Sequence, residues 1–140
     1  MTKLLLLIPI VLLGGLVVLS VISQRRTAPG VVDGRLRPGS DKPNAVSSEA
    51  GTPEGQRVEP LTVSRDRLRA VIGETGGTIV TDSDDYIAAT YSTPLLRYVD
   101  DVEFRRDGDV WQVRSASRVG HSDMGANRKR VERIRAALIQ

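Results

Sequence analysis

Polar and charged side chains suited to catalysis or ligand binding are concentrated between Asp100 and Arg128. They combine carboxylates, hydroxyls, one amide and three guanidinium groups: Asp100, Arg114, Ser115, Ser117, Arg118, Ser122, Asp123, Asn127 and Arg128. They surround a predicted junction between a strand and a helix, where free backbone N–H groups and nearby arginines can hold an anion. The alternative is that the same groups satisfy one another, with Asp123 as the cap of the helix. The sequence thus predicts a binding junction and leaves a purely structural role open.

A second set of chemistry-bearing residues is the acidic group Asp100, Asp101 and Glu103, which has the types of a metal site or an acid–base pair. Alternation along a strand places Asp101 and Glu103 on one face and Asp100 on the other. We therefore expect these side chains to form structural ion pairs rather than a two-carboxylate site.

The tripeptide His121-Ser122-Asp123 contains the residue types of a hydrolase triad. A triad is assembled across space, with a base that reaches the nucleophile and a third group that orients the base, so adjacency along the chain argues against one. The chain has one His and no Cys, which excludes polyhistidine metal sites and thiol chemistry. We therefore expect a protein that is not an enzyme and that has no metal and no cofactor.

The element that positions the predicted junction is a β-hairpin. Asp107-Gly108 separates two runs with strand character, which is a strong hairpin signal. A two-residue loop at that step sets Phe104 opposite Trp111 on an apolar face. It also sets Asp101 opposite Arg114 on the other face, as a cross-strand ion pair.

Capping and turn signals predict the elements before the hairpin. Ser64 can cap a helix that stops at Gly76-Gly77. Short β-branched or aromatic runs at 78–81 and 86–92 then predict two strands.

A second helix is predicted at the C-terminus, beginning after Ser122 or Asp123. Its apolar side is formed by residues at helical spacing: Met124, Val131, Ile134 and Leu138. The order of elements predicts a compact α+β domain over residues 61–140, in which an antiparallel sheet of three to four strands is covered by two helices.

The chain begins with an apolar stretch, Leu4 to Ile22, in which nineteen positions carry no charge. As a helix, at about 1.5 Å per residue, it matches the roughly 30 Å hydrocarbon core of a bilayer. Residues 1–23 are therefore predicted to be a single-pass transmembrane helix, a signal anchor closed by Arg25-Arg26. A cleaved signal peptide is the alternative, because Val21 and Ser23 are small enough for a cleavage site.

Residues 24–60 are rich in Pro, Gly and Ser, which interrupt both helices and strands. We expect a tether with little regular structure between the anchor and the domain. Within it, residues 37–48 are expected to lie against the domain.

The stretch from Asp100 to Arg135 reads DDVEFRRDGDVWQVRSASRVGHSDMGANRKRVERIR. Its acidic strand, followed by RSASRxGxSDxGxNRxR, closely resembles the C-terminal signature of the family called domain of unknown function 1499. The tract RPGSDKPNAVSSEA is similar to the N-terminal motif of that family, so the resemblance extends from about Leu36 to Leu138. It implies a compact domain that is often exported or linked to a membrane, without a settled activity.

This chain departs from the family pattern at two positions. The pattern usually has two Cys where this chain has Gly39 and Ala45. If that pair forms a disulfide or binds a metal in relatives, the role is absent here.

The membrane side of the domain is predicted in opposite ways by two signals. Arg25, Arg26, Arg35 and Arg37 follow the apolar stretch and favour a cytoplasmic domain by the positive-inside rule. The resemblance implies export. We expect an extracytoplasmic domain.

The net charge of +3 is unevenly distributed. Residues 110–140 carry seven basic and two acidic side chains, whereas residues 61–109 carry six basic and ten acidic ones. No aromatic residues interleave with the basic end, and the acidic middle would repel phosphates, so nucleic acid is not an expected partner. The expected partners are the bilayer, through Leu4–Ile22, and an anionic ligand or lipid head groups.

The sequence therefore predicts a membrane-anchored, non-catalytic binding or envelope-associated module. Two alternatives stay open. One is a hydrolase-like enzyme that uses Asp100 or Asp123 with Arg118, and the other is a purely structural envelope protein.

Overall fold

The computed structural model describes the backbone of residues 2–139 and the side chains of residues 8–139. Within this range the elements follow in the order α1 (Thr2–Arg25), β1 (Ala45–Ser47), η1 (Glu54–Gln56), α2 (Arg65–Glu74), β2 (Thr78–Asp82), β3 (Tyr86–Ser92), β4 (Val99–Asp107), β5 (Val110–Ser117) and α3 (Ala126–Leu138). The strands form one antiparallel sheet in the order β1-β5-β4-β3-β2. The predicted α+β class is confirmed, with five strands instead of three or four.

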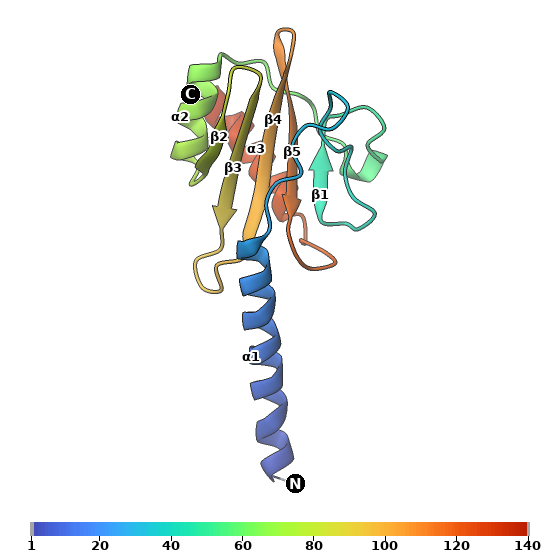
Figure 1. Ribbon diagram of the computed structural model, residues 1–140, viewed down its shortest axis with the longest axis vertical. Helices are drawn as coiled ribbons and strands as arrows, with labels where there is room; N and C mark the ends of the chain where they lie inside the picture. Colours follow the sequence, from blue (N-terminus) through green and yellow to red (C-terminus); the bar gives the residue numbers. More distant parts are fainter. Residues whose placement is uncertain (1, 140) are drawn as a thin grey trace.

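One face of the sheet is covered by α2 and α3, while the segment that follows α1 runs across the other face (Figure 1). The helix-covered face holds the apolar core. In it, Phe104 and Trp111 of the hairpin cluster with Ile72 of α2 and Ile134 of α3, all at most 2% exposed. Burying a large apolar side chain contributes about 1.5–3 kcal/mol, so this core holds the sheet in place. The strand residues of the opposite face are therefore presented on a rigid support.

The turn between β4 and β5 differs from the prediction by one residue. Asp107 pairs with Val110, so the loop consists of Gly108 and Asp109 rather than Asp107 and Gly108. Of the two loop residues only Gly108 has a positive φ, at 61°. This is the pattern of the hairpin turn that requires glycine at its first central position.

The register of the hairpin is consequently shifted by two residues. Glu103, rather than Asp101, lies opposite Arg114, and Phe104 lies two positions away from its predicted partner Trp111. The predicted pair Asp101–Arg114 is therefore wrong. Because side chains alternate with a period of two, the shift leaves each of these residues on its predicted face.

The helix α2 and the strand β3 form where their signals predicted. Ser64 caps α2 by accepting a hydrogen bond from the Arg67 N–H at 3.3 Å. The helix ends at Glu74, and Gly76 follows with a positive φ of 91°.

The start of α3 is stabilised by Asp123, which accepts hydrogen bonds from the N–H groups of Gly125 and Asn127, both at 2.9 Å. Asp123 therefore binds the first turn as predicted, although Gly125 and not Asp123 occupies the N-cap position. The prediction that Met124 lies on the apolar side is wrong, because its side chain is 91% exposed. Gly125 adopts a left-handed conformation before Ala126, so the helix begins two residues later than that prediction assumed.

The segment between residues 24 and 60 is more ordered than predicted. It contains β1 and η1, and Leu36 and Val58 are at most 5% exposed. β1 pairs with β5, and the Ser48 N–H extends the pairing by donating to the Val113 carbonyl at 2.9 Å. The expectation of little regular structure is thus wrong at β1 and η1. The expectation that 37–48 lie against the domain is confirmed for β1 and its flanks.

The helix α1 is long and apolar enough to span a membrane. Its window Ile8–Arg25 has a mean hydropathy of 1.9 and is 11% buried. It projects from the end of the domain where the β3–β4 and β5–α3 loops lie (Figure 1).

The C-terminal end of α1 is attached to the domain by hydrogen bonds. Arg118 Nη1 donates to the Ser23 carbonyl at 2.9 Å, and Ser23 Oγ accepts from the Val99 N–H at 3.2 Å. Tyr98 Oη donates to the Leu16 carbonyl at 3.1 Å. The C-terminal end of α1 is therefore fixed to the domain by direct contacts.

Candidate functional site

The residues predicted for the junction divide between the two faces of the sheet. Those on or near the helix-covered face are Asp100, Ser115, Ser117, Asp123 and Asn127. Arg114 and Arg118 point the other way, toward the segment that follows α1. The junction therefore contains two polar groups rather than one, and they meet at Ser117 and Asn44, which bond Asn127 and also line the cleft on the opposite face.

The group on the helix-covered face is centred on Asn127, which is fully buried. Its Oδ1 accepts from Ser115 Oγ at 2.7 Å and from Arg130 Nη1 at 2.6 Å. Its Nδ2 donates to the Asn44 carbonyl at 3.0 Å and to Asp123 Oδ2 at 2.7 Å. We call the following residues the Asn127 cluster: Asn44, Asp100, Ser115, Ser117, Asp123, Asn127 and Arg130.

The remaining members of the Asn127 cluster are also paired. Asp100 forms an ion pair with Arg130 at 2.6 Å, and Ser117 Oγ accepts from Asn127 at 2.9 Å. Arg130 also lies over the Tyr91 ring, 5.1 Å from its centroid. Among the described side chains, no N or O atom of this cluster is buried without a partner. The cluster therefore satisfies its hydrogen bonds internally and connects α3 to β5 and to the start of β1.

Two other predicted residues make local contacts. Arg128 donates to the Gly55 and Arg57 carbonyls, both at 3.0 Å, and thereby holds η1 against α3. Ser122 Oγ accepts from the Met124 N–H at 3.3 Å. Both contacts stabilise the chain, and neither residue lies among the arginines of the opposite face.

On the opposite face, Arg118 forms a two-point ion pair with Asp101. Its Nε and Nη2 lie 2.8 and 2.6 Å from the two carboxylate oxygens. The Arg118 carbonyl accepts from Arg26 Nη1 at 2.6 Å. The two N–H groups on the Nε–Nη2 edge of Arg118, the edge that suits an oxyanion, are thus both occupied by Asp101.

Next to this pair lies Glu103, whose side chain is completely buried. It accepts from the Gly30 N–H at 2.8 Å and from Tyr86 Oη at 2.9 Å, and it pairs with Arg114 Nη1 at 3.2 Å. Burial raises the pKa of Glu103 above its ordinary value, although Tyr86 and Arg114 oppose the shift. Burial and the Glu103 charge likewise raise the pKa of Tyr86. The Glu103 carboxylate therefore has a structural role.

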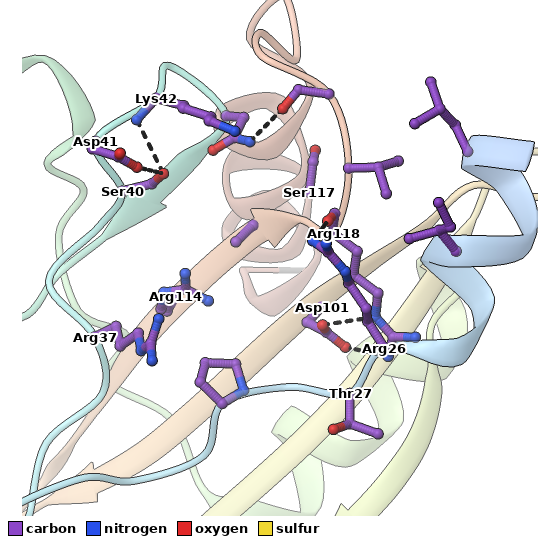
Figure 2. Close-up of a pocket in the computed structure, with 17 residues that line it drawn as sticks. Arg26, Thr27, Arg37, Ser40, Asp41, Lys42, Asp101, Arg114, Ser117 and Arg118 are labelled. Atoms are coloured by element: carbon purple, nitrogen blue, oxygen red, sulfur yellow. Dashed lines mark hydrogen bonds and ion pairs between the residues drawn. The ribbon is translucent and has the colours of Figure 1, made fainter. Parts of the chain in front are cut away.

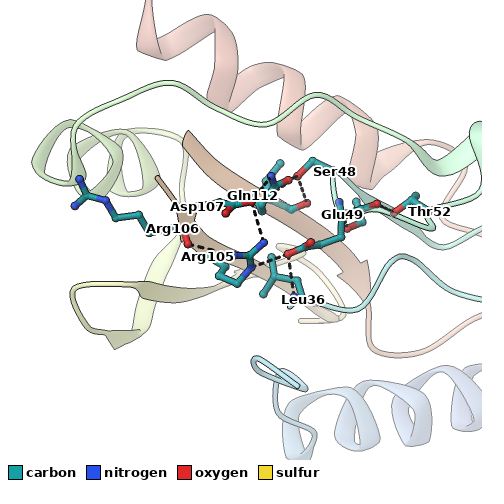
Figure 3. A network of polar contacts seen from close by, with 10 residues as sticks. Leu36, Ser48, Glu49, Thr52, Arg105, Arg106, Asp107 and Gln112 are labelled. Atoms are coloured by element: carbon teal, nitrogen blue, oxygen red, sulfur yellow. Dashed lines mark hydrogen bonds and ion pairs between the residues drawn. The ribbon is translucent and has the colours of Figure 1, made fainter. Parts of the chain in front are cut away.

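A third polar network on the same face ties β1 to the hairpin (Figure 3). Glu49 Oε1 accepts from Arg105 Nε at 2.8 Å and from the Leu36 N–H at 3.0 Å. Hydrogen bonds from Gln112 and from Arg105 lower the pKa of Asp107. The charged groups of this network are therefore paired with one another.

A cleft of about 600 Å³ lies on this face, between the end of α1, the segment after it and β5 (Figure 2). We call it the basic cleft, after the five basic side chains that line it: Arg26, Arg37, Lys42, Arg114 and Arg118. Asp41 and Asp101 are its two acidic residues, which leaves a net charge of +3. Leu19 and Ile22 of α1 form an apolar part of the wall.

Arg114 is the residue of the basic cleft whose hydrogen bonding is incomplete. It is 7% exposed, and its Nε is buried without an acceptor among the described residues. Only its Nη1 is used, by Glu103. Burial lowers the pKa of Arg114, the charge of Glu103 opposes this shift, and the charge of Arg37, which lies beside it, lowers the pKa further. A buried donor without an acceptor costs about 1–3 kcal/mol.

The residues considered for catalysis or metal binding lie apart from one another in the structure. Among residues 2–139, no group of three His, Asp or Glu side chains could hold a metal. Asp100 and Asp123 both line a second cavity of about 350 Å³, but each is already paired within the Asn127 cluster. Arg118 does not line that cavity. His121 is exposed and lines neither cavity.

Sequence reasoning missed five residues of these two groups: Arg26, Arg37 and Lys42 in the cleft, and Asn44 and Arg130 in the Asn127 cluster. The first three lie in the segment predicted as a tether, where no periodic pattern marks a face. For Arg130 a signal was available, because it lies three residues after Asn127 and therefore on the same side of α3.

Comparisons with known proteins agree with the extent of this domain. The sequence model of a family described as "Protein of unknown function (DUF1499)" matches residues 35–138. Neither the curated proteins nor the solved structures include a match to the chain.

Proposed function

The chain belongs to the DUF1499 family, and we propose that it is a membrane-anchored, non-catalytic binding module that holds an anionic ligand in the basic cleft. The observation that carries the proposal is Arg114, a buried guanidinium with an unsatisfied Nε beside the second cation Arg37. The ion pair with Glu103 uses only Nη1 of Arg114, so folding alone does not explain the like-charge contact with Arg37, which destabilises the fold. An anion between the two side chains would relieve that contact and accept from Nη2 of Arg114, which has no partner among the described residues.

The free cations of the cleft are available to such a ligand. Among the described residues, the side chains of Arg37 and Lys42 have no hydrogen bond or ion pair, and both residues are exposed. Arg118, in contrast, uses both Nε and Nη2 on Asp101, whereas Arg114 uses only Nη1 on Glu103 and keeps Nη2 without a described partner. We therefore assign the binding role to Arg37, Lys42 and Arg114.

Membrane anchoring is supported by the length and hydropathy of α1 and by its direct attachment to the domain. With such an attachment the basic cleft would stay close to the bilayer surface. We further propose that the domain is extracytoplasmic, as the family resemblance implies.

Of the two alternatives, the hydrolase has little support from the geometry. Its acid residues, Asp100 and Asp123, lie on the helix-covered face, whereas Arg118 is held by Asp101 on the opposite face. The purely structural envelope protein differs from our proposal in one measurable way, because it predicts no specific response to anions.

The proposal is tested by thermal unfolding of the full chain in a neutral detergent. Phosphate is titrated against chloride at equal ionic strength. We expect phosphate to raise the melting temperature in a saturable way, since a ligand at 100 times its Kd stabilises a protein by about 2.7 kcal/mol.

Two variants locate the effect. Arg37→Ala should abolish the response to phosphate, while Arg133→Ala, an exposed arginine of α3 outside the cleft, should preserve it. A response that is absent, or that survives Arg37→Ala unchanged, would overturn the proposed anion site and favour the structural alternative.

The membrane side is tested separately by fusing alkaline phosphatase after Gln140 and expressing the fusion in a bacterial host. The described end of α3 lies near α2, at the end of the domain away from α1 (Figure 1), so the reporter should not disturb the anchor. We expect an active reporter. An inactive but stable fusion would place the domain in the cytoplasm.

A further inference from the structure

We infer that the anion bound by the basic cleft is the phosphate of a lipid headgroup, taken from the leaflet in which α1 ends. This inference rests on the proposed function, and it names the ligand class and its source. It is carried by the depth at which the domain meets α1 and by the mixed apolar and basic wall of the cleft.

The depth is set by the hydrogen bonds between α1 and the β3–β4 loop. Tyr98 Oη reaches the Leu16 carbonyl, and Ser20 Oγ donates to the Leu96 carbonyl. Leu16 lies six residues before Ile22, which corresponds to about 9 Å along a helix axis. If Leu4–Ile22 fill the hydrocarbon core, this loop extends from the level of the headgroups to about 9 Å inside the core, among the upper acyl carbons.

The exposed apolar side chains of the domain agree with this depth. Leu95 in the β3–β4 loop and Met124 in the β5–α3 loop are each 91% exposed. Both loops lie at the α1 end of the domain (Figure 1). Apolar side chains in water cost free energy, which contact with lipid would recover. Tyr98 is likewise a residue type that favours the bilayer interface.

The basic cleft is at the same level, because its wall includes Leu19 and Ile22 of α1. These two apolar side chains line it together with the cations Arg37, Lys42 and Arg114. A ligand that fills it would therefore meet apolar surface on the membrane side and positive charge on the sheet side. A lipid with a phosphate headgroup has this polarity, whereas a free inorganic anion uses only the basic part.

Phosphate suits the basic part because it offers several strong acceptor oxygens around one centre. A guanidinium binds two of them through parallel N–H groups, and an ammonium adds a point charge. Arg37 supplies the first kind of contact, Arg114 adds a donor through Nη2, and Lys42 supplies the second kind.

The inference is tested by comparing three ligands on the full chain in a neutral detergent, with thermal unfolding and titration calorimetry. The ligands are dihexanoyl phosphatidic acid, glycerol 3-phosphate, which has the phosphate without the chains, and dihexanoylglycerol, which has the chains without the phosphate. We expect phosphatidic acid to bind at least about tenfold more tightly than glycerol 3-phosphate, the gain from burying roughly two methylene groups. Dihexanoylglycerol should not stabilise the protein.

Matched variants separate the two parts of the cleft. Arg37→Ala should weaken both phosphate ligands. The double variant Leu19→Ala/Ile22→Ala should remove only the advantage of phosphatidic acid. Its control, Val18→Ala/Val21→Ala, changes exposed residues of α1 outside the cleft and should bind both ligands as the parent does.

Two outcomes would overturn the inference while the proposed anion site survives. One is equal affinity for phosphatidic acid and glycerol 3-phosphate, with both sensitive to Arg37→Ala. The other is a preference for phosphatidic acid that Leu19→Ala/Ile22→Ala leaves unchanged, because the chains would then bind elsewhere. If no phosphate ligand binds, both the inference and the proposed function fail.

Discussion

Each face of the sheet carries a polar group near the same end, but the two groups differ in how completely their hydrogen-bonding atoms are satisfied. In the Asn127 cluster, the central amide uses both of its atoms within the protein, and the charges of Asp100 and Arg130 are paired. In the basic cleft, Arg114 keeps a buried donor without an acceptor and faces Arg37. A buried polar group that is fully satisfied is explained by folding alone. A buried polar group that is unsatisfied is not explained by folding alone. This difference is why we assign ligand binding to the cleft.

The largest expected effect comes from the ion pair beneath the cleft. Arg114→Leu leaves the completely buried Glu103 without its cation. Removing one partner of a buried pair costs about 3–5 kcal/mol, so the free energy of unfolding at pH 7 should fall by that amount in chemical denaturation.

This loss should depend on pH in a defined direction. The pKa of Glu103 is already raised by burial, so the folded state binds the proton more tightly than the unfolded state does. Stability then falls as the pH rises from the ordinary value of 4.5 through the folded pKa. The deficit of Arg114→Leu should therefore shrink as the pH is lowered toward 4.5. The double variant Arg114→Leu/Glu103→Gln should recover most of the loss, and equal instability of both variants would show that charge is not the cause.

The next effect concerns the centre of the other face. Asn127→Ala removes partners from Ser115, Asn44 and Arg130, and leaving a buried polar group unsatisfied costs about 1–3 kcal/mol. Denaturant unfolding should show this loss, while Lys129→Ala on the solvent side of α3 should show none. The stabilisation by phosphate should persist in Asn127→Ala. If that response is lost, the two faces are not independent and the comparison fails.

Much of the sheet could be predicted because its signals are local. The strand Tyr86–Ser92 appears with its predicted bounds, and the faces of the hairpin follow from alternation. The register could not be predicted as reliably, because a shift of two residues keeps every side chain on its face. The three residues of β1 could not be recognised, since they gain their order from β5, about 70 residues further along the chain.

The candidate site could be predicted only in part. Arg114 and Arg118 were identified because Arg114 lies on a strand with a clear pattern and Arg118 directly follows that strand. The sequence could not show that Arg37 and Lys42 join them, since these come from an irregular segment that returns to the sheet through nonlocal contacts. The division of the junction between two faces was also hidden, because Ser115 and its neighbour Arg114 are adjacent in sequence and opposite in space.

A smaller effect is expected at the cap of α3. Asp123→Ala removes acceptors from the N–H groups of Gly125 and Asn127, and loss of a helix cap costs about 0.5–2 kcal/mol. Burial acts to raise the pKa of Asp123, but these hydrogen bonds outweigh it and lower the pKa below 3.8. The cap therefore contributes fully above pH 3.8 and is lost as the pH falls through the folded value.

The measurement for Asp123 is the difference in unfolding free energy between the parent and Asp123→Ala, taken at pH 7 and again below pH 3.8. The difference should be close to its full size at pH 7 and should approach zero in acid. Asp123→Asn retains an acceptor without the charge, so its penalty at pH 7 should be smaller than that of Asp123→Ala, and it should likewise shrink in acid as the parent loses its charged acceptor. A pH-independent penalty for Asp123→Ala would exclude ionisation of this cap.

The smallest expected effect has the opposite sign and bears most directly on the comparison. Arg37 is exposed, has no described partner, and opposes the charge of Arg114, so Arg37→Ala should raise the melting temperature slightly in a low-salt buffer without phosphate. The rise should be about 2 °C or less, because interactions of exposed charges are weak. It should disappear near 1 M salt, where the screening length is about 3 Å. Arg133→Ala should change nothing under either condition. If Arg37→Ala lowers the melting temperature instead, Arg37 stabilises the fold as Arg130 does on the other face, and the cleft would have no more claim to a ligand than the Asn127 cluster.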